Sequence, residues 1–176
     1  MHMIKKLKHK ALSARERKQQ VLQNVNKRKA YFWLSTWFGS GLITPASGTW
    51  GTLFSMPFVV AAYIFGGATA LLIGCVIIFA IGLWAAQQFE KDSKSHDSSM
   101  IVIDETAGMF LAAATVNGSV FSFVLAFILF RFFDALKPWP ICLLDKKVNG
   151  AFGVMIDDIL AGIFAAAVLW GIHEFI

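Results

Sequence analysis

Long apolar stretches separated by short polar segments run through this chain. Three stretches contain no Asp, Glu, Lys or Arg, and they cover residues 31–89, 106–130 and 159–173. Because a helix needs about 20 apolar residues to cross a bilayer, the pattern is typical of an integral membrane protein. It predicts five helices, over residues 52–65, 68–89, 100–116, 120–136 and 151–176.

Turns and polar loops separate these predicted helices. Gly66-Gly67 and the sequence from Asn117 to Ser119 favour tight turns. Polar loops are expected over residues 90–99 and 137–150, the second of them opened by two prolines that end the preceding helix. We therefore predict an all-α fold, a small polytopic membrane bundle of about five membrane-embedded helices.

A glycine-rich segment precedes the first predicted helix. Residues 39–51 contain four glycines and one proline, which argue against a regular helix. At membrane depth, irregular backbone is tolerated only where protein buries it or where it lines a wet cavity. We therefore expect this segment to be a loop that folds back over a functional site.

Composition and charge divide the chain into two parts. The chain has 176 residues, of which 57% are hydrophobic, so one membrane-embedded domain over residues 31–176 accounts for nearly all of it. Residues 1–30 form a basic arm with ten Lys and Arg and one Glu, a formal charge of +9. Such an arm predicts a cytoplasmic N-terminus that lies on anionic lipid and has no nucleic-acid partner. The simpler interpretation is a solvated, partly disordered tail that only sets orientation.

The remaining basic residues indicate how the helices are threaded. The two predicted turns are uncharged, whereas the loops at 90–99 and 137–150 contain lysines. Five segments threaded from a cytoplasmic N-terminus put every basic loop inside and both uncharged turns outside, as the positive-inside rule requires. We therefore predict a multi-pass membrane protein with its functional site on the cytoplasmic face.

Acidic residues gather at that same face. A carboxylate near the centre of a bilayer costs about 2.5–3.5 kcal/mol on insertion scales, so several of them need compensation. A hard divalent cation such as Mg²⁺ takes oxygen ligands and commonly binds one or two carboxylates together with a substrate phosphate. The candidate catalytic and metal-binding residues are Asp104, Glu105, Asp134, Asp157 and Asp158.

Basic and polar side chains complete the predicted site. Arg131 shares a helical face with Asp134, and Lys137 continues that face, so both cations are candidates for holding phosphoryl oxygens. The other candidate substrate-binding residues are Ser40, Thr49 and His96. Simpler readings exist: acid pairs at helix N-termini often only cap the helix, an Arg–Asp pair can be purely structural, and a loop histidine is more often just exposed.

Several other chemistries are missing from the sequence. The chain contains no D-x-D-x-T, no P-loop, no H-E-x-x-H and no nucleophile elbow. Its two cysteines, Cys75 and Cys142, provide neither a disulfide framework nor metal-ligand spacing. No cleavable signal peptide is expected, because the first apolar run starts too late in the chain.

Five sequence strings together carry a family resemblance that extends over residues 38–171. They are F-G-S-G-L at 38–42, S-G-T-W-G-T at 47–52, H-D-S-S-M-I-V-I-D-E at 96–105, F-R-F-F-D-A-L-K-P-W-P-I at 130–141 and G-V-M-I-D-D-I-L-A-G at 153–162. The chain thereby resembles the phosphatidylglycerophosphatase A family of bacterial inner-membrane lipid phosphatases, although Ser47 stands where that family has proline. The resemblance implies Mg²⁺-dependent removal of the terminal phosphate from phosphatidylglycerophosphate, which gives phosphatidylglycerol.

Two hypotheses from different functional classes follow. The first is a metal-dependent lipid phosphomonoesterase in which the attacking group is a metal-bound water or, alternatively, an aspartate that becomes phosphorylated. The second is a small ion or proton transporter that uses its intramembrane carboxylates. Transporters usually place such sites near the midplane between repeated halves, whereas this chain shows no repeat and gathers its acids at one face. The oligomeric state stays open.

Overall fold

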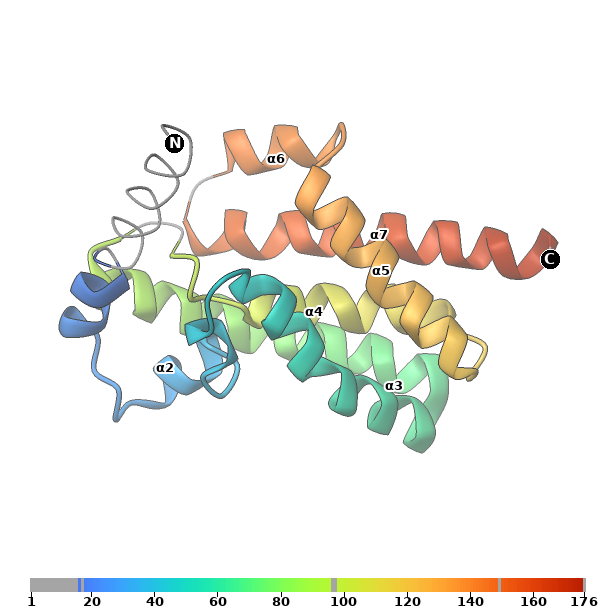
Figure 1. Ribbon diagram of the computed structural model, residues 1–176, viewed down its shortest axis with the longest axis horizontal. Helices are drawn as coiled ribbons and strands as arrows, with labels where there is room; N and C mark the ends of the chain where they lie inside the picture. The colour runs from blue at the N-terminus through green and yellow to red at the C-terminus, as the bar shows by residue number, and fades with distance from the viewer. Residues whose placement is uncertain (1–15, 17, 96–97, 149, 176) are drawn as a thin grey trace, which may run out of the picture.

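The chain folds into a bundle of helices (Figure 1). The computed structural model describes residue 16 and residues 18–95, 98–148 and 150–175, and these contain no strand. The all-α prediction is therefore confirmed. The α-helices are α2 (Ala30–Ser35), α3 (Ser47–Ser93), α4 (Ile103–Ala112), α5 (Val120–Leu136), α6 (Ile141–Lys147) and α7 (Ala151–Phe175), and the short 3₁₀ helices are η1 (Ser40–Leu42) and η2 (Ala113–Thr115).

The long helix α3 is a hairpin of two helices. Its backbone leaves helical geometry at Gly66 (φ −158°, ψ 18°) and Gly67 (φ 59°, ψ −147°), and the second half runs back beside the first (Figure 1). The positive φ of Gly67 is one that residues with a Cβ rarely adopt. The predicted turn at this glycine pair is confirmed, and the second half extends to Ser93 rather than to residue 89.

Helix α4 lies at the centre of the bundle, in contact with α3, α5 and α7. Eight of its ten residues are buried. The predicted helix over 100–116 is too long at both ends, because α4 begins at Ile103 and gives way to η2 at Ala113. The residues just before it, from Met100 to Val102, are also buried, so tertiary packing holds them although they are not helical.

Two segments predicted as loops contain helix. Helix α3 begins at Ser47, so the last part of the glycine-rich segment is helical, and the prediction of an irregular loop over all of 39–51 is wrong. Glycine costs about 1 kcal/mol in a helix, but at Gly51 it allows close packing, because a Cβ there would lie 2.6 Å from Cβ of Val102. The predicted loop at 137–150 contains α6, which starts directly after Pro140 and buries Ile141.

Two helices, α3 and α7, are long and apolar enough to cross a membrane by length and composition. Large apolar side chains cover much of the outer surface of the bundle, among them Phe65 (89% exposed) and Val76 (68% exposed). Soluble monomers rarely expose apolar area on this scale. The described surface therefore has the character of a membrane protein.

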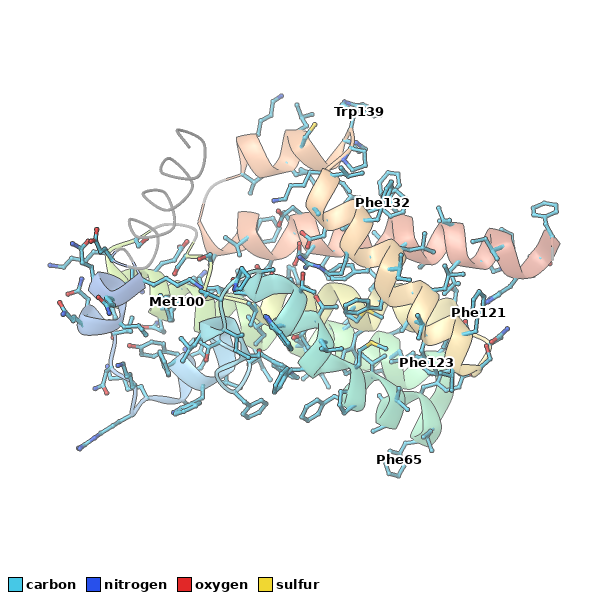
Figure 2. The ribbon with its side chains drawn as sticks, in the orientation of Figure 1. Phe65, Met100, Phe121, Phe123, Phe132 and Trp139 are labelled. Atoms are coloured by element: carbon cyan, nitrogen blue, oxygen red, sulfur yellow. The ribbon has the colours of Figure 1, made fainter. Side chains whose placement is uncertain are left out.

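The two uncharged turns lie together at one end of the bundle. Phe65 beside the first turn and Phe121 beside the second appear at the same end in Figure 2, which is also the end of the C-terminus in Figure 1. A Cβ on Gly118 of the second turn would come within 3.1 Å of the Tyr63 hydroxyl. The two turns therefore share one end of the molecule, as the predicted threading requires.

The segment before α3 packs against the other end of the bundle. Val25, Tyr31 and Phe32 are buried in one apolar cluster with Phe89. The Tyr31 hydroxyl donates a hydrogen bond to Oδ2 of Asp92 at 2.5 Å. Burial and then this hydrogen bond raise the pKa of Tyr31, so its hydroxyl remains a donor at neutral pH. The division at residue 30 stays a prediction.

Helices α4 and α7 touch through two glycines. A Cβ on Gly108 would lie 2.6 Å from the carbonyl oxygen of Asp158, and a Cβ on Gly162 would lie 2.6 Å from the carbonyl oxygen of Gly108. Small residues at such positions let helix backbones approach closely. Each of these glycines lies one turn after an acid pair, Asp104-Glu105 on α4 and Asp157-Asp158 on α7.

We expect Gly162→Ala to lower the thermal unfolding temperature of the purified protein in detergent. The added methyl group meets backbone that cannot move aside, and overpacking of this kind typically costs about 1–3 kcal/mol. Gly171→Ala is the matched control, because it lies on the same helix and its Cβ would meet nothing within 4 Å. Equal unfolding temperatures for the two variants would contradict this account of the contact.

Candidate functional site

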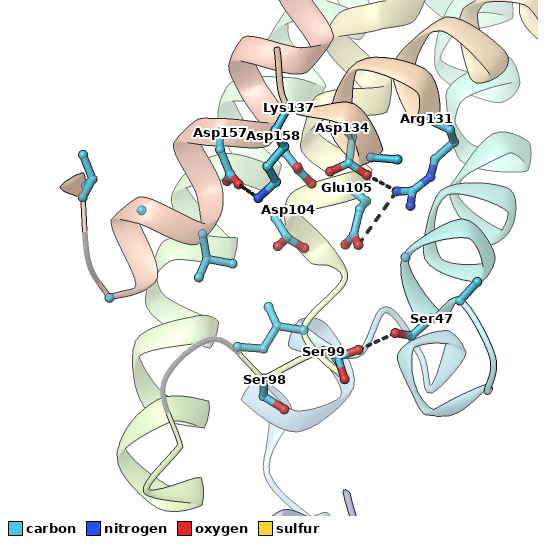
Figure 3. Close-up of a pocket in the computed structure, with 18 of the residues that line it drawn as sticks. Ser47, Ser98, Ser99, Asp104, Glu105, Arg131, Asp134, Lys137, Asp157 and Asp158 are labelled. Atoms are coloured by element: carbon cyan, nitrogen blue, oxygen red, sulfur yellow. Dashed lines mark hydrogen bonds and ion pairs between the residues drawn. The ribbon is translucent and has the colours of Figure 1, made fainter. Parts of the chain in front are cut away.

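Three helices deliver the predicted acidic and basic residues to one cavity of about 700 Å³. Helix α4 contributes acids from its first turn, α5 contributes Arg131 and Asp134 near its end, and α7 contributes its acid pair (Figure 3). The first turn of α3 and Ser98 and Ser99 line the same cavity. The predicted convergence of all five acids is therefore observed in the structure.

Three of the five acids form a compact group. One carboxylate oxygen from each of Asp104, Glu105 and Asp158 lies within 4.8 Å of the other two. Asp104 is only 7% exposed and Asp158 only 4%. Three carboxylates held this close and largely buried repel one another strongly unless a positive charge compensates them.

Each acid of this group also has a buried oxygen without a hydrogen-bond donor. These atoms are Oδ1 of Asp104, Oε2 of Glu105 and Oδ2 of Asp158, as judged among the described residues. Leaving a buried oxygen without a hydrogen bond costs free energy. Such atoms are rare in folded proteins, so three of them in one place call for an explanation, for which an absent ligand is a candidate. Hard oxygen donors with unused lone pairs match a hard divalent cation, so the residues present fit a metal ion.

Arg131 connects α5 with α3 and α4. Its guanidinium forms an ion pair with Asp134, and its Nη1 lies 4.0 Å from Oε1 of Glu105. The same nitrogen donates to the hydroxyl of Thr52 at 3.4 Å. The shared face predicted for Arg131 and Asp134 is thus present, and the arginine also lies near Glu105 of α4.

Lys137 caps the end of α5 and reaches α7. It adopts a left-handed backbone conformation (φ 42°), and its Nζ lies 2.5 Å from Oδ2 of Asp157. The two acids of α7 therefore face different groups: Asp157 turns to the lysine, whereas Asp158 belongs to the three-acid group. Neighbouring residues on a helix point about 100° apart, which makes this division possible.

Two of the predicted substrate-binding residues, Ser40 and Thr49, do not line the cavity. Ser40 is buried, and its hydroxyl donates to the backbone oxygens of Thr36 (3.2 Å) and Trp37 (2.9 Å). Thr49 is exposed, and neither residue lines the cavity. His96 lies outside the described residues.

Other residues of the cavity were missed in the sequence. Ser47 donates from its hydroxyl to the backbone oxygen of Ser99 at 2.5 Å, which joins the start of α3 to the loop before α4. Gly48, Glu90 and Ser98 also line the cavity. Except for Glu90, all of these residues lie inside the strings that carried the family resemblance, but none of them was singled out there as a candidate for the site.

Comparisons with known proteins identify the family of this chain. The family model for Phosphatidylglycerophosphatase A matches residues 33–173. A Phosphatidylglycerophosphatase A of Haemophilus influenzae is 42% identical over 141 residues, which cover 80% of this chain and 86% of the relative. The Phosphatidylglycerophosphatase A of Escherichia coli is 37% identical over 140 residues, 78% of this chain and 80% of the relative.

A further relative has a different name. A protein of Bacteroides thetaiotaomicron, provisionally named phosphatidylinositol-3-phosphatase, is 36% identical over 139 residues, 75% of this chain and 86% of the relative. No solved structure matches this one. With a family match that spans most of the helical domain and includes every residue of the three-acid group, the chain belongs to the phosphatidylglycerophosphatase A family.

Proposed function

We propose that this protein hydrolyses phosphatidylglycerophosphate to phosphatidylglycerol and phosphate with the help of Mg²⁺. The observation that carries the proposal is the three-acid group, Asp104, Glu105 and Asp158, whose carboxylates converge and whose buried oxygens lack donors among the described residues. The names of the relatives from Haemophilus influenzae and Escherichia coli supply the substrate.

The charge of the cavity explains why a cation is needed. Six acidic side chains and two basic ones line it, Glu90 included, which gives a formal charge of −4. A phosphomonoester is itself anionic and would be repelled from such a cavity. When bound by the three-acid group, Mg²⁺ would neutralise part of this charge and act as a Lewis acid toward a phosphoryl oxygen.

The remaining charged residues would orient the substrate. Arg131 keeps N–H groups beyond those directed at its carboxylate neighbours, and a guanidinium matches phosphate geometry well. Lys137 would donate to a second phosphoryl oxygen from the opposite wall. Asp134 and Asp157 would hold these two cations in place through their ion pairs. Hydrolysis moves a proton from water to the departing glycerol oxygen, and the carboxylates of the cavity are the groups that can carry it.

Membrane placement belongs to the same proposal. We infer that the two halves of α3, the pair α4 and η2, α5 and α7 are five membrane-embedded segments of a multi-pass protein of the bacterial inner membrane. The positive-inside rule supports a cytoplasmic location for the end with Lys137 and for the N-terminus. A phospholipid could then present its headgroup to the cavity while its acyl chains stay in the bilayer. Transport of ions or protons, the other hypothesis, is not favoured by the family.

Purified protein in detergent is expected to release phosphate from phosphatidylglycerophosphate when Mg²⁺ is present, and EDTA is expected to stop the release. Phosphatidylglycerol, which has only a phosphodiester, should yield no phosphate. Phosphatidylinositol 3-phosphate is the informative comparison substrate, given the name of the Bacteroides relative. Release that continues undiminished in EDTA would exclude the proposed role of the cation.

Asp158→Asn should abolish turnover while leaving a folded protein. The substitution keeps the shape of the side chain but removes the charge of a proposed metal ligand, so the loss should exceed the roughly 10- to 100-fold typical of residues that only support a ligand. Glu174→Gln is the matched control, since Glu174 is exposed near the far end of the same helix. The rate of phosphate release measures both, and near wild-type turnover by Asp158→Asn would remove that residue from the site.

Cysteine labelling tests the orientation. In a Cys142→Ser background, Lys147→Cys places a thiol at the exposed end of α6, and Ser119→Cys places one in the turn at the opposite end. A membrane-impermeant maleimide added to intact spheroplasts should label residue 119, and it should label residue 147 only after lysis. The natural Cys75 is buried and should stay unreactive. The reverse labelling pattern would place the cavity on the outer face.

A further inference from the structure

Gly48 occupies an unusual place among the glycines of this protein. It is the second residue of α3 and lines the cavity. A Cβ at this position would lie 2.2 Å from Oε1 of Glu105 and 3.1 Å from each terminal nitrogen of Arg131. The bare backbone of α3 is therefore the wall against which the Glu105 carboxylate rests.

The two oxygens of Glu105 have different surroundings. Oε1 lies between Gly48 and Arg131, whose Nη1 is 4.0 Å away. Oε2 is buried and has no hydrogen-bond donor among the described residues. Contacts of Oε1 with the protein fix the orientation of the Glu105 carboxylate, and Oε2 is then available to bind a ligand.

The wall itself is tied to the arginine. The Thr52 hydroxyl donates to the backbone oxygen of Gly48 at 2.8 Å and accepts the hydrogen bond from Arg131 Nη1 at 3.4 Å. Thr52 is fully buried. The first turn of α3, the arginine of α5 and the glutamate of α4 therefore form one connected arrangement, in which the position of Gly48 sets the position of Glu105.

A side chain added at residue 48 would displace another side chain, whereas one added at several other tightly packed glycines would collide with backbone. At Gly41, Gly153 and Gly162 the atom nearest to an added Cβ is a backbone oxygen, which cannot move without displacing a helix or loop. At Gly48 the nearest atom is the end of a flexible side chain. Alanine is also intrinsically favoured over glycine in helices, by up to about 1 kcal/mol in a helix interior, so the fold should accept Gly48→Ala while the carboxylate of Glu105 moves.

We propose that Gly48 is a positioning residue for Glu105: by presenting bare backbone, it lets the carboxylate reach the cation site that Glu105 shares with Asp104 and Asp158. This inference rests on the proposed cation site. It assigns the glycine of the Ser47-Gly48-Thr49 string a role in metal affinity, whereas the sequence had suggested substrate binding by Thr49.

Binding of Mn²⁺, a spectroscopic substitute for Mg²⁺, tests the inference without any measurement of turnover. Electron paramagnetic resonance titration in detergent should show that Gly48→Ala weakens Mn²⁺ binding by about 10- to 100-fold, the range typical of residues that orient a metal ligand. The unfolding temperature without metal should stay near that of the wild type. Gly171→Ala, which has open space around its Cβ, should bind Mn²⁺ normally.

A double-substitution cycle separates positioning of Glu105 from any other role of the glycine. Glu105→Asp shortens the acid by one methylene and vacates the space that a Cβ at residue 48 needs. The effect of Gly48→Ala on Mn²⁺ affinity should therefore largely disappear in the Glu105→Asp background, because the two residues interact directly. If Gly48→Ala alone fails to fold, recovery of folding in that background supports the same coupling.

The possible outcomes distinguish the two proposals. A wild-type protein that binds no Mn²⁺ overturns the cation site and with it the present inference. Wild-type binding combined with equal affinity in Gly48→Ala overturns only the role of Gly48. An undiminished effect of Gly48→Ala in the Glu105→Asp background, or failure of both variants to fold, also overturns it, since the glycine would then serve the backbone.

Discussion

The contact between α4 and α7 is the constraint on which the candidate site depends. At Gly108 and Gly162 the two helices approach so closely that an added Cβ on either would meet the backbone of the other. Because Gly108 lies one turn beyond Asp104, and its neighbour across the interface is the backbone of Asp158, this contact brings both carboxylates to the same point. A wider spacing between the helices would leave two separate buried acids and no shared site for a cation.

The site combines acidic and basic side chains that are largely buried around one cavity. Ion pairs with Arg131 and Lys137 compensate two of its acids directly, Asp134 and Asp157. The three-acid group keeps buried oxygens without donors. The two ion pairs, Arg131–Asp134 and Lys137–Asp157, contribute little net stability, because the cost of desolvating the charges offsets their attraction. Their value lies in orientation, and they fix where an anionic substrate and a cation would meet.

Much of the fold could be predicted from local sequence signals. Helix α5 has the predicted ends because Ser119 caps its start, where its side chain accepts a hydrogen bond from the backbone of Ser122, and because Pro138 follows its end. The bend in α3 follows from a glycine pair. The start of α3 could not be predicted in this way, since its glycines favour a loop in isolation. In the fold, Gly51 packs against Val102 and Gly48 against Glu105, contacts that local sequence does not reveal.

The sequence identified most of the charged residues of the site, but not how their side chains are arranged. Loop charges and helix ends place the five acids together, but rotation about each helix axis decides which carboxylates meet. Asp157 and Asp158 are neighbours in sequence, yet one faces Lys137 and the other joins the three-acid group. Glu90 lies in no motif, and Ser47 was noted only because it stands in place of a proline. The places of both residues in the cavity come from α3 meeting α4 and α7 in space.

The shortness of α4 has a consequence for the way the protein is made. A helix of 10 residues is about 15 Å long, roughly half the thickness of the hydrocarbon core, and it begins with two acids. In the membrane placement proposed above, such a segment would be too short and too acidic to enter lipid as an isolated helix. It would instead insert together with α3, α5 and α7, the helices that it contacts, and the docking of α7 would complete both the burial of α4 and the acid cluster.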